Sequence, residues 1–496
     1  MRFAAVPFAL APVGERRFRA PVPAGGWTGE RDATSPALAQ PQPRLGPELV
    51  PGMMPTTTGD DSLTLTIWAP EGAGPRPVMV WIHGGSFMIG AASLPTYDAQ
   101  QLASEGDVVV VAINYRLGAL GWMALDQHGG QEWGAAANCG LLDQALALRW
   151  VRDHIGSYGG DPANVTVFGE SAGGGSILHL LASPAARGAF DRAIVQSGAT
   201  GRTLSTEQSG AVAHVLLEEL GFARAEPALA AKTSDEIVAA QERATVQLFG
   251  VAGLLPFHPA LDAATLPITP LAALQSGEVR GIDVLLGFTT DEMRLFLDRP
   301  TLDAERLRSR AARYFGSDDT PSGNAKVDTL LDSYRSLLTD SARPAEPIDV
   351  WAALFSDREM LVPAVSALDA HAAAGGRTFA YQFDWSSARP RADGLELRSF
   401  HGVDIPFTFA TFAVDGWDAF VGADADPQGA HALSAALRAS WCGFARTGDP
   451  AHEGVGPWPL YTAGDRSMMR LARESGIEHD PAAARLAALA AAGVAP

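Results

Sequence analysis

Six short apolar runs, separated by stretches with helical periodicity, constrain the fold of this 496-residue chain most strongly. They are predicted to be β-strands at 77–85, 107–115, 164–170, 192–199, 282–288 and 378–385. Several are almost continuously apolar, which is typical of strands covered on both faces. Between them, residues 141–155 carry Leu142, Leu146 and Trp150 on one predicted helix face, as a crossover helix would. This alternation predicts an α/β fold with a mostly parallel central sheet flanked by helices.

The rest of the chain is predicted to elaborate that sheet within one domain, residues 1–496. Two ranges of mainly helical pattern, about 200–280 and 300–375, are expected to be insertions near the carboxyl edge of the sheet, over the active site. The first 60 residues are rich in Pro and Gly and are expected to lie as loops over the core. The Ala-rich residues 482–493 are expected to form a terminal helix.

Charge and cysteine content exclude several classes of protein. The formal net charge is −19, which argues against binding to nucleic acid or to anionic lipid, since both need basic patches. The sequence has no apolar run of about 18 residues, so no membrane span is expected. Its two cysteines, Cys139 and Cys442, are too few for a disulfide framework and favour a reducing, cytoplasmic location.

The segment "FGESAGGGS", residues 168–176, places Ser171 two residues from a glycine on either side. Apolar residues precede it and "SILHLLA" follows it, so the pattern predicts a strand, a sharp turn and a helix. Such a turn holds a serine hydroxyl away from the backbone as a nucleophile. By itself the motif also fits a glycine-rich turn without a catalytic role.

A serine nucleophile needs a general base, and the base needs an orienting acid, in the chain order serine, acid, histidine. His401 is the best candidate for the base, because "SFHGVDIPFTF" places it in a loop beside an apolar segment. Four other candidates after Ser171 lie in Ala-rich helical stretches, polar loops or the acidic tail: His371, His431, His452 and His479. Asp291 and Glu292 follow the strand "IDVLLGF", and from the residues alone either could be the acid.

The segment "HGGSF", residues 83–87, follows a strongly apolar strand and is predicted to supply an oxyanion hole. Its donors would be the backbone amides of Gly85 and Ser86, together with the amide of Ala172 after the nucleophile. A glycine-rich turn is the alternative for this motif alone. The four motifs in this order strengthen one another.

These motifs resemble those of the type B carboxylesterases over nearly the whole chain. The segments that carry the resemblance include "VMVWIHGGSF", "NCGLLDQALALRWVRDHIGSYGGDPANVTVFGESAGG", "GFTTDEMRLF" and "FHGVDIPFTFA". The resemblance implies an α/β-hydrolase fold, with Ser171 as nucleophile, Glu292 as acid and His401 as base. It implies the same oxyanion donors and three supporting polar residues, which are Glu170, Ser197 and Asp404.

Four departures from the family pattern stand out. Ser62 replaces a cysteine that usually forms a disulfide, Ser86 replaces the third glycine of the oxyanion loop, and Met293 replaces the glycine after the acid. The family's N-terminal hairpin is expected to be missing. These changes are expected to alter local structure rather than the chemistry.

The sequence therefore predicts a serine carboxylesterase that cleaves a small-molecule ester through an acyl-enzyme, without a metal or organic cofactor. The same residues could cleave a carbamate or an amide, and a non-catalytic binding homologue is a weaker alternative. The apolar stretch 248–257 could line a substrate pocket or belong to the core. The oligomeric state, monomer or small homo-oligomer, stays open.

Overall fold

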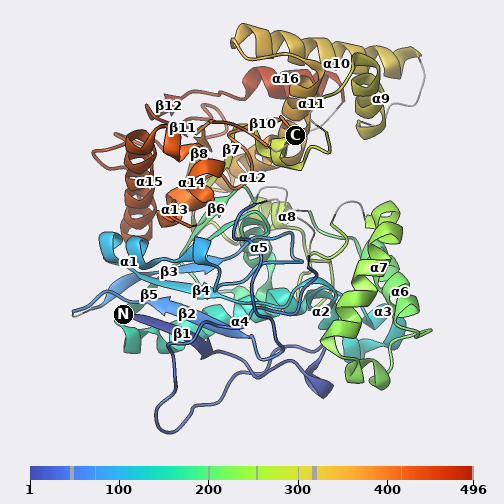
Figure 1. Cartoon of the computed structure of the whole chain (residues 1–496), viewed down its shortest axis with the longest axis vertical. Helices are drawn as coiled ribbons and strands as arrows, with labels where there is room; N and C mark the ends of the chain where they lie inside the picture. The colour runs from blue at the N-terminus through green and yellow to red at the C-terminus, as the bar shows by residue number, and fades with distance from the viewer. Residues whose placement is uncertain are drawn as a thin grey trace.

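The computed structural model of the chain describes residues 1–44, 50–72, 74–198, 202–252, 255–299, 301–315, 321–391, 393–414 and 416–493. Its main feature is a ten-stranded sheet of order β1-β2-β4-β3-β5-β6-β7-β8-β11-β12 (Figure 1). The strands are β1 (Arg2–Pro7), β2 (Thr64–Trp68), β3 (Arg76–Ile82), β4 (Val109–Ile113), β5 (Gly160–Glu170), β6 (Arg192–Gln196), β7 (Asp283–Thr289), β8 (Thr378–Phe383), β11 (Met468–Leu471) and β12 (Gly476–Glu478). Neighbours from β4 to β11 are parallel, and the pairs at the two edges are antiparallel.

All six predicted strands are present, as β3 to β8, and form the parallel centre of the sheet. The prediction for 192–199 included Ala199, which lies outside the described residues. Four strands at or next to the sheet edges were not predicted, β1, β2, β11 and β12, nor was a separate hairpin of β9 (Ser387–Pro390) and β10 (Glu396–Arg398). The first 60 residues are therefore not only loops, because β1 pairs with β2. β1 and β12 are only partly buried and two threonines interrupt the apolar residues of β2, so these strands lack the continuous apolar signal of the centre.

Alternate residues of the central strands face two different cores. In β3, Val78, Val80 and Ile82 pack on one face, and Met79 and Trp81 pack on the other. The first face is covered by α4 (Cys139–His154), α5 (Ala172–Ala182), α8 (Pro270–Ser276) and α12 (Val362–Ala373), and its core continues into α6 (Thr206–Glu219) and α7 (Ser234–Ala252). The second face is covered by α1 (Gln100–Gly106), α13 (Ile405–Phe409) and α15 (Pro427–Thr447). Three short helices complete the main body: α2 (Gly118–Gly121), α3 (Asp126–Gly129) and α14 (Trp417–Phe420).

The crossover helix predicted at 141–155 is α4, but of the three residues predicted on one face only Trp150 is buried. Leu142 and Leu146 are only half-buried, whereas Leu141, Leu148 and Val151 are completely buried. Contacts with α5 and β5 cover one side of α4, and α2 and a short 3-10 helix cover others. A helix covered on several sides has no single apolar stripe to read from sequence.

The two helical ranges contain different kinds of element. A separate cluster joins α9 (Ala304–Tyr314), α10 (Pro321–Asp340), α11 (Pro347–Ser356) and the C-terminal helix α16 (Ala483–Ala491), at the top of Figure 1. By contrast, α8 and α12 pack on the sheet itself, so they belong to its covering layer rather than to an insertion. A π-helical turn, Asp357–Leu361, joins α11 to α12.

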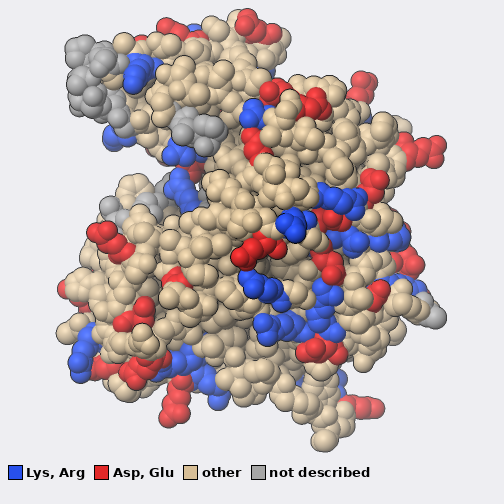
Figure 2. All heavy atoms as spheres, turned by 180° about the vertical axis from the view of Figure 1, so that it is seen from behind, with Lys and Arg blue, Asp and Glu red and all other residues tan. Residues whose placement is uncertain are grey.

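The surface mixes both signs of charge. Figure 2 shows basic and acidic side chains interspersed over one face, which is hollowed between the α9–α10 unit and the α6–α7 unit. Among the helices described, none combines the length and the apolar character needed to cross a membrane.

Candidate active site

Ser171 occupies the turn between β5, which ends at Glu170, and α5, which begins at Ala172. Its backbone has φ 57° and ψ −122°, a conformation that L-residues rarely adopt. Two hydrogen bonds hold the turn: the Ser171 amide donates to the Gln196 carbonyl at 2.9 Å, and the Gly175 amide donates to the Ser171 carbonyl at 2.8 Å. Strain of this kind persists where the surroundings enforce it, commonly at functional sites.

Glycines make the turn possible because strand and helix approach closely there. A Cβ atom on Gly173 would lie 1.9 Å from the Ile82 carbonyl oxygen of β3. A Cβ atom on Gly169 would lie 2.7 Å from the same oxygen. Any larger residue at these positions would push α5 away from β3, and Ser171 would move with α5.

His401 and Glu292, which lie 109 residues apart in sequence, meet beside this turn. Nδ1 of His401 and Oε2 of Glu292 lie 2.5 Å apart, and both side chains are buried. Because the carboxylate accepts at Nδ1, the lone pair of the neutral imidazole is left on Nε2. The Thr289 amide donates to Oε1 of Glu292 at 2.7 Å and so fixes the carboxylate. Sequence reasoning had not singled out Thr289, whose backbone role leaves no side-chain signal.

Asp291 points elsewhere. Its carboxylate forms a hydrogen-bonded ion pair with Arg343, in the loop between α10 and α11. Asp291 occupies the N-cap position of the 3-10 helix Glu292–Phe296, but its side chain makes no capping hydrogen bond there. The geometry therefore separates the two carboxylates that the residues alone had left as alternatives.

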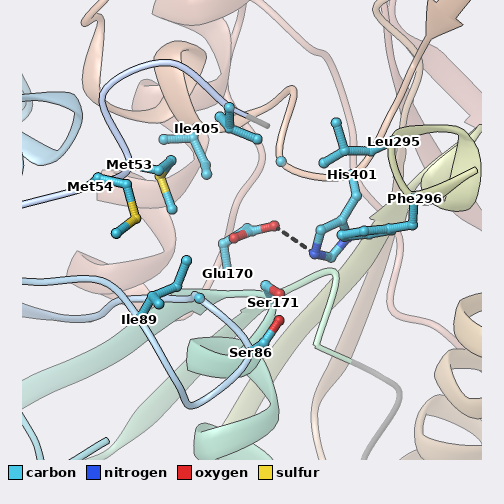
Figure 3. Close-up of a pocket in the computed structure, with 13 residues that line it drawn as sticks. Met53, Met54, Ser86, Ile89, Glu170, Ser171, Leu295, Phe296, His401 and Ile405 are labelled. Atoms are coloured by element: carbon cyan, nitrogen blue, oxygen red, sulfur yellow. Dashed lines mark ion pairs between the residues drawn. The ribbon is translucent and has the colours of Figure 1, made fainter. Parts of the chain in front are cut away.

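Glu170, buried between the nucleophile turn and His401, places Oε1 3.2 Å from Nε2 of His401 (Figure 3). Burial raises the pKa of Glu170 to about 8. Burial by itself lowers the pKa of His401, but the carboxylates of Glu170 and Glu292 outweigh it and raise that pKa to about 9. The two side chains therefore compete for a proton at Nε2 of His401. Among the described residues, no hydrogen bond joins the Ser171 hydroxyl to His401.

The two other predicted supporting residues lie in the same buried region. Oδ2 of Asp404 accepts a hydrogen bond from Gln196 at 2.8 Å, and burial raises the pKa of Asp404 to about 6. Ser197 follows Gln196 directly and is fully buried. Gln196, which also accepts from the indole of Trp441 at 3.2 Å, was not predicted. The feature of the sequence that could have identified Gln196 is its position at the end of β6, directly before Ser197.

The predicted oxyanion loop follows β3 and turns through left-handed backbone. Gly85 has φ 107° and Ser86 has φ 56°. The amides of Met88 and Ile89 both donate to the Gly85 carbonyl at 3.0 Å, which closes the loop. In the described part of the chain, neither the amide of Gly85 nor that of Ser86 donates a hydrogen bond to a backbone carbonyl in the loops and turns. The Ala172 amide, in the first turn of α5, has no partner within the helix.

The four other candidate histidines after Ser171 line neither of the two cavities that reach Ser171. His371 is buried, and its Nδ1 lies 2.8 Å from the Thr378 hydroxyl, between α12 and β8. His431 is exposed on α15, His452 contacts the Ala436 carbonyl, and His479 pairs with Asp465. In the described ranges, no group of three or more acidic, His or Cys side chains has the arrangement of a metal site.

Two cavities meet at Ser86, Ser171 and His401, and we call them the small lobe and the large lobe. The small lobe has a volume of about 170 Å³. Apart from the shared residues, Glu170 and backbone glycines, its wall is apolar (Figure 3): Val50, Met53, Met54, Ile89, Leu295, Phe296 and Ile405. The large lobe has a volume of about 440 Å³ and a mixed wall that includes Phe87, Ser197, Arg202, Leu255, His258, Met293, Phe355, Glu359, Met360 and Arg391.

The stretch 248–257 had been left open between pocket and core, and the structure divides it. Leu255 lines the large lobe, whereas Leu248 and Phe257 are fully buried in the core. Residues 253–254 lie outside the described residues. Met293, the residue after Glu292, also lines the large lobe.

Comparison with known proteins decides the family. The carboxylesterase family model matches residues 1–489. The chain belongs to the carboxylesterase family. It is 36% identical to the para-nitrobenzyl esterase of Bacillus subtilis over 488 residues, with 96% of this chain and 92% of the relative covered. It is 34% identical to a phenmedipham hydrolase of Pseudarthrobacter oxydans, covering 94% and 90% of the two chains.

Solved structures agree with this assignment. A thermophilic para-nitrobenzyl esterase is 34% identical, with a TM-score of 0.83 and coverage of 98% of this carboxylesterase and 95% of the other chain. A carboxylesterase of Geobacillus stearothermophilus is 33% identical, with the same TM-score and coverage. The predicted α/β-hydrolase fold and the predicted class, a carboxylic ester hydrolase, are therefore confirmed. The findings do not favour the carbamate or amide hydrolase that the sequence had left as an alternative.

Proposed function

We propose that this carboxylesterase cleaves its ester on Ser171, with His401 as general base and Glu292 as the acid that orients it. One observation supports this most directly: Ser171, held in a strained turn, lines the same cavities as a buried imidazole whose Nδ1 is bonded to Glu292. The bond at Nδ1 leaves the lone pair of the neutral ring on Nε2, the nitrogen that a serine hydroxyl must reach. A carboxylate in this position orients the base and stabilises the imidazolium.

In the first half of the reaction, Ser171 Oγ attacks the ester carbonyl and passes its proton to Nε2 of His401. The negative charge on the carbonyl oxygen would be stabilised by the amides of Gly85, Ser86 and Ala172, which the closed loop and the first turn of α5 present. His401 then gives the proton to the leaving alcohol. In the second half, His401 activates water, which releases the acid from Ser171.

The two lobes would hold the two halves of the ester. The leaving oxygen must receive its proton from Nε2 of His401, and Nε2 faces Glu170. Glu170 lines the small lobe and not the large one. We therefore assign the alcohol half to the small apolar lobe and the acyl half to the large lobe.

The test is covalent labelling combined with a serine variant. A sulfonyl fluoride should add one adduct, which peptide mass spectrometry should locate at Ser171, and should abolish hydrolysis of a short-chain aryl ester. Ser171→Ala should lower kcat about 10⁶-fold, as loss of the nucleophile does in other serine hydrolases. One carbamate and one anilide in the same assay measure the alternative reactions. An active Ser171→Ala enzyme, or an adduct on another residue, would refute the assignment.

We further propose that the enzyme works in the cytoplasm, as a monomer or a small homo-oligomer. The support for a reducing compartment is that Cys139 and Cys442 are both free and buried. Fractionation of the source cells tests the location. Light scattering of the purified enzyme, with and without substrate, measures the oligomeric state.

A further inference from the structure

The wall of the large lobe holds a histidine that the reaction does not use. His258 lies in the segment between α7 and α8, is only 4% exposed, and lines this lobe. Nδ1 of His258 lies 2.6 Å from the carbonyl oxygen of Leu255. A carbonyl oxygen can only accept a hydrogen bond, so Nδ1 carries the proton and Nε2 of the neutral ring is an acceptor.

The ring is held in place while Nε2 is left without a donor. His258 stacks on Phe87 of the oxyanion segment, with ring centroids 6.4 Å apart and planes inclined by 30°. Among the described residues, no donor bonds to Nε2 of His258. The other non-catalytic histidine of the lobe, His179, differs, because its Nδ1 lies 2.7 Å from the Gly175 carbonyl and its Nε2 lies 3.1 Å from the Thr203 hydroxyl. Burial lowers the pKa of His258 to about 4, so the ring is neutral at pH 7.

The charged residues of the lobe do not favour an anionic ligand. Arg202 forms a hydrogen-bonded ion pair with Glu359, and Nε of Arg391 donates to Asp393 at 3.0 Å. Both arginines that line the lobe are thus already paired with a carboxylate. A neutral hydrogen-bond donor on the ligand would instead satisfy Nε2 of His258, because an acceptor left unpaired in a largely buried site costs free energy.

We propose that Nε2 of His258 accepts a hydrogen bond from the acyl half of the substrate, so that the enzyme prefers esters of acids that carry a hydroxyl or N–H group. This inference rests on the proposed function and on the assignment of the acyl half to the large lobe. His258 is then a specificity-determining residue, and the preferred ester joins such an acid to a compact apolar alcohol.

The test compares three series of ethyl esters at equal heavy-atom count: esters of unsubstituted acids, of ω-hydroxy acids and of methoxy acids. The terminal group is placed two to six methylenes from the carbonyl. At one or more chain lengths, kcat/KM for the hydroxy ester should be about 3- to 10-fold higher than for the unsubstituted and the methoxy ester of equal size. This is the range expected for one hydrogen bond. The methoxy esters supply an acceptor without a donor and should gain nothing.

Variants locate the preference at His258. His258→Phe keeps an aromatic ring on Phe87 and removes the acceptor. The ratio of kcat/KM for the hydroxy ester to kcat/KM for the unsubstituted ester should therefore fall to about 1 or below. His258→Gln retains a carbonyl acceptor and should restore part of the ratio. His431→Phe makes the same change at an exposed histidine outside both lobes and should leave the ratio as it is.

The outcomes separate two failures. If unsubstituted esters are hydrolysed and no chain length shows a hydroxyl preference, the role of His258 is overturned and the proposed function stands. A hydroxyl preference that persists in His258→Phe has the same consequence. If preference appears when the hydroxyl is moved to the alcohol half instead, the lobe assignment and the inference are both wrong. Failure to hydrolyse any ester would overturn the proposed function itself.

Discussion

Asp291 and Glu292 are neighbours of the same charge type, yet their surroundings give them different tasks. Glu292 bonds His401 and is fixed by the Thr289 amide, whereas Asp291 pairs with Arg343. Consecutive residues at a strand end point in different directions, so only one of the two can reach the imidazole.

Glu292→Gln should therefore lower kcat by about 10⁴-fold, because it removes the charge that orients and stabilises the His401 imidazolium. Asp291→Asn is the matched control, and it should leave kcat near the wild-type value. Its cost should be about 1 kcal/mol of unfolding free energy, since Arg343 is partly exposed and stays hydrated. Steady-state kinetics and denaturant unfolding of both variants measure these effects. A crippled Asp291 variant beside an active Glu292 variant would reverse the assignment.

Glu170 should set the pH at which the enzyme becomes active. Only the neutral imidazole can accept the serine proton, so activity should rise as pH increases through the pKa of His401. Glu170→Gln removes one of the two carboxylates that raise this pKa. The acid limb of the kcat/KM–pH profile should move to lower pH by roughly 1 to 3 units, the usual influence of one nearby opposite charge. Ser197→Ala, which changes no charge, should leave the limb in place. An unmoved limb in Glu170→Gln would contradict this account.

At the scale of elements, the site depends on how closely α5 approaches β3. The nucleophile begins α5 and the oxyanion loop follows β3, so a change in this spacing alters the distance between attacking oxygen and stabilising amides. Glycine is needed at Gly173, where the backbones touch, and is not needed two residues further along the helix, at Gly175.

Gly173→Ala should be damaging, because its Cβ would lie 1.9 Å from the Ile82 carbonyl oxygen. We expect a loss of about 1 to 3 kcal/mol of stability from overpacking, together with a fall in kcat. Gly175→Ala is the control in the same helix, since its Cβ would meet nothing nearer than 3.6 Å. It should keep or raise the melting temperature, because alanine favours helix. Calorimetry and kinetics of both variants measure this, and equal melting temperatures would count against the close approach.

At the scale of the whole molecule, the sheet separates the two thiols. Cys139 begins α4, which covers one face, whereas Cys442 lies in α15 and packs in the core of the other. Burial raises the pKa of Cys139 to about 11 and that of Cys442 to about 12, so both are protonated and unreactive at neutral pH.

Neither thiol should react with an alkylating agent in the native enzyme, and reductant should leave activity unchanged. After unfolding without reductant, both thiols should be alkylated, since no disulfide joins them. Intact mass measured before and after unfolding counts the modified thiols. Protection of both thiols in the unfolded chain would show a disulfide and contradict the reducing location proposed above.

The sequence by itself determined the central strands and the position of Ser171, because these signals are local. A continuous apolar run predicts a buried parallel strand wherever it occurs, and glycines two residues from a serine restrict its turn directly. The chain order serine, acid, histidine singled out His401, and the family resemblance chose Glu292 over Asp291. Edge strands such as β1 and β12 escaped prediction, because a short strand covered on one side has no such signal.

Only the tertiary structure decided which side chains meet. The bond between Glu292 and His401 spans 109 residues, and the pairing of Asp291 with Arg343 spans 52. The buried face of α4 depends on which elements surround it, and the acceptor state of His258 depends on the Leu255 carbonyl beside its ring. The direction in which a side chain points and its protonation state depend on neighbours that come from distant segments of the chain. They therefore cannot be predicted from the order of residues alone.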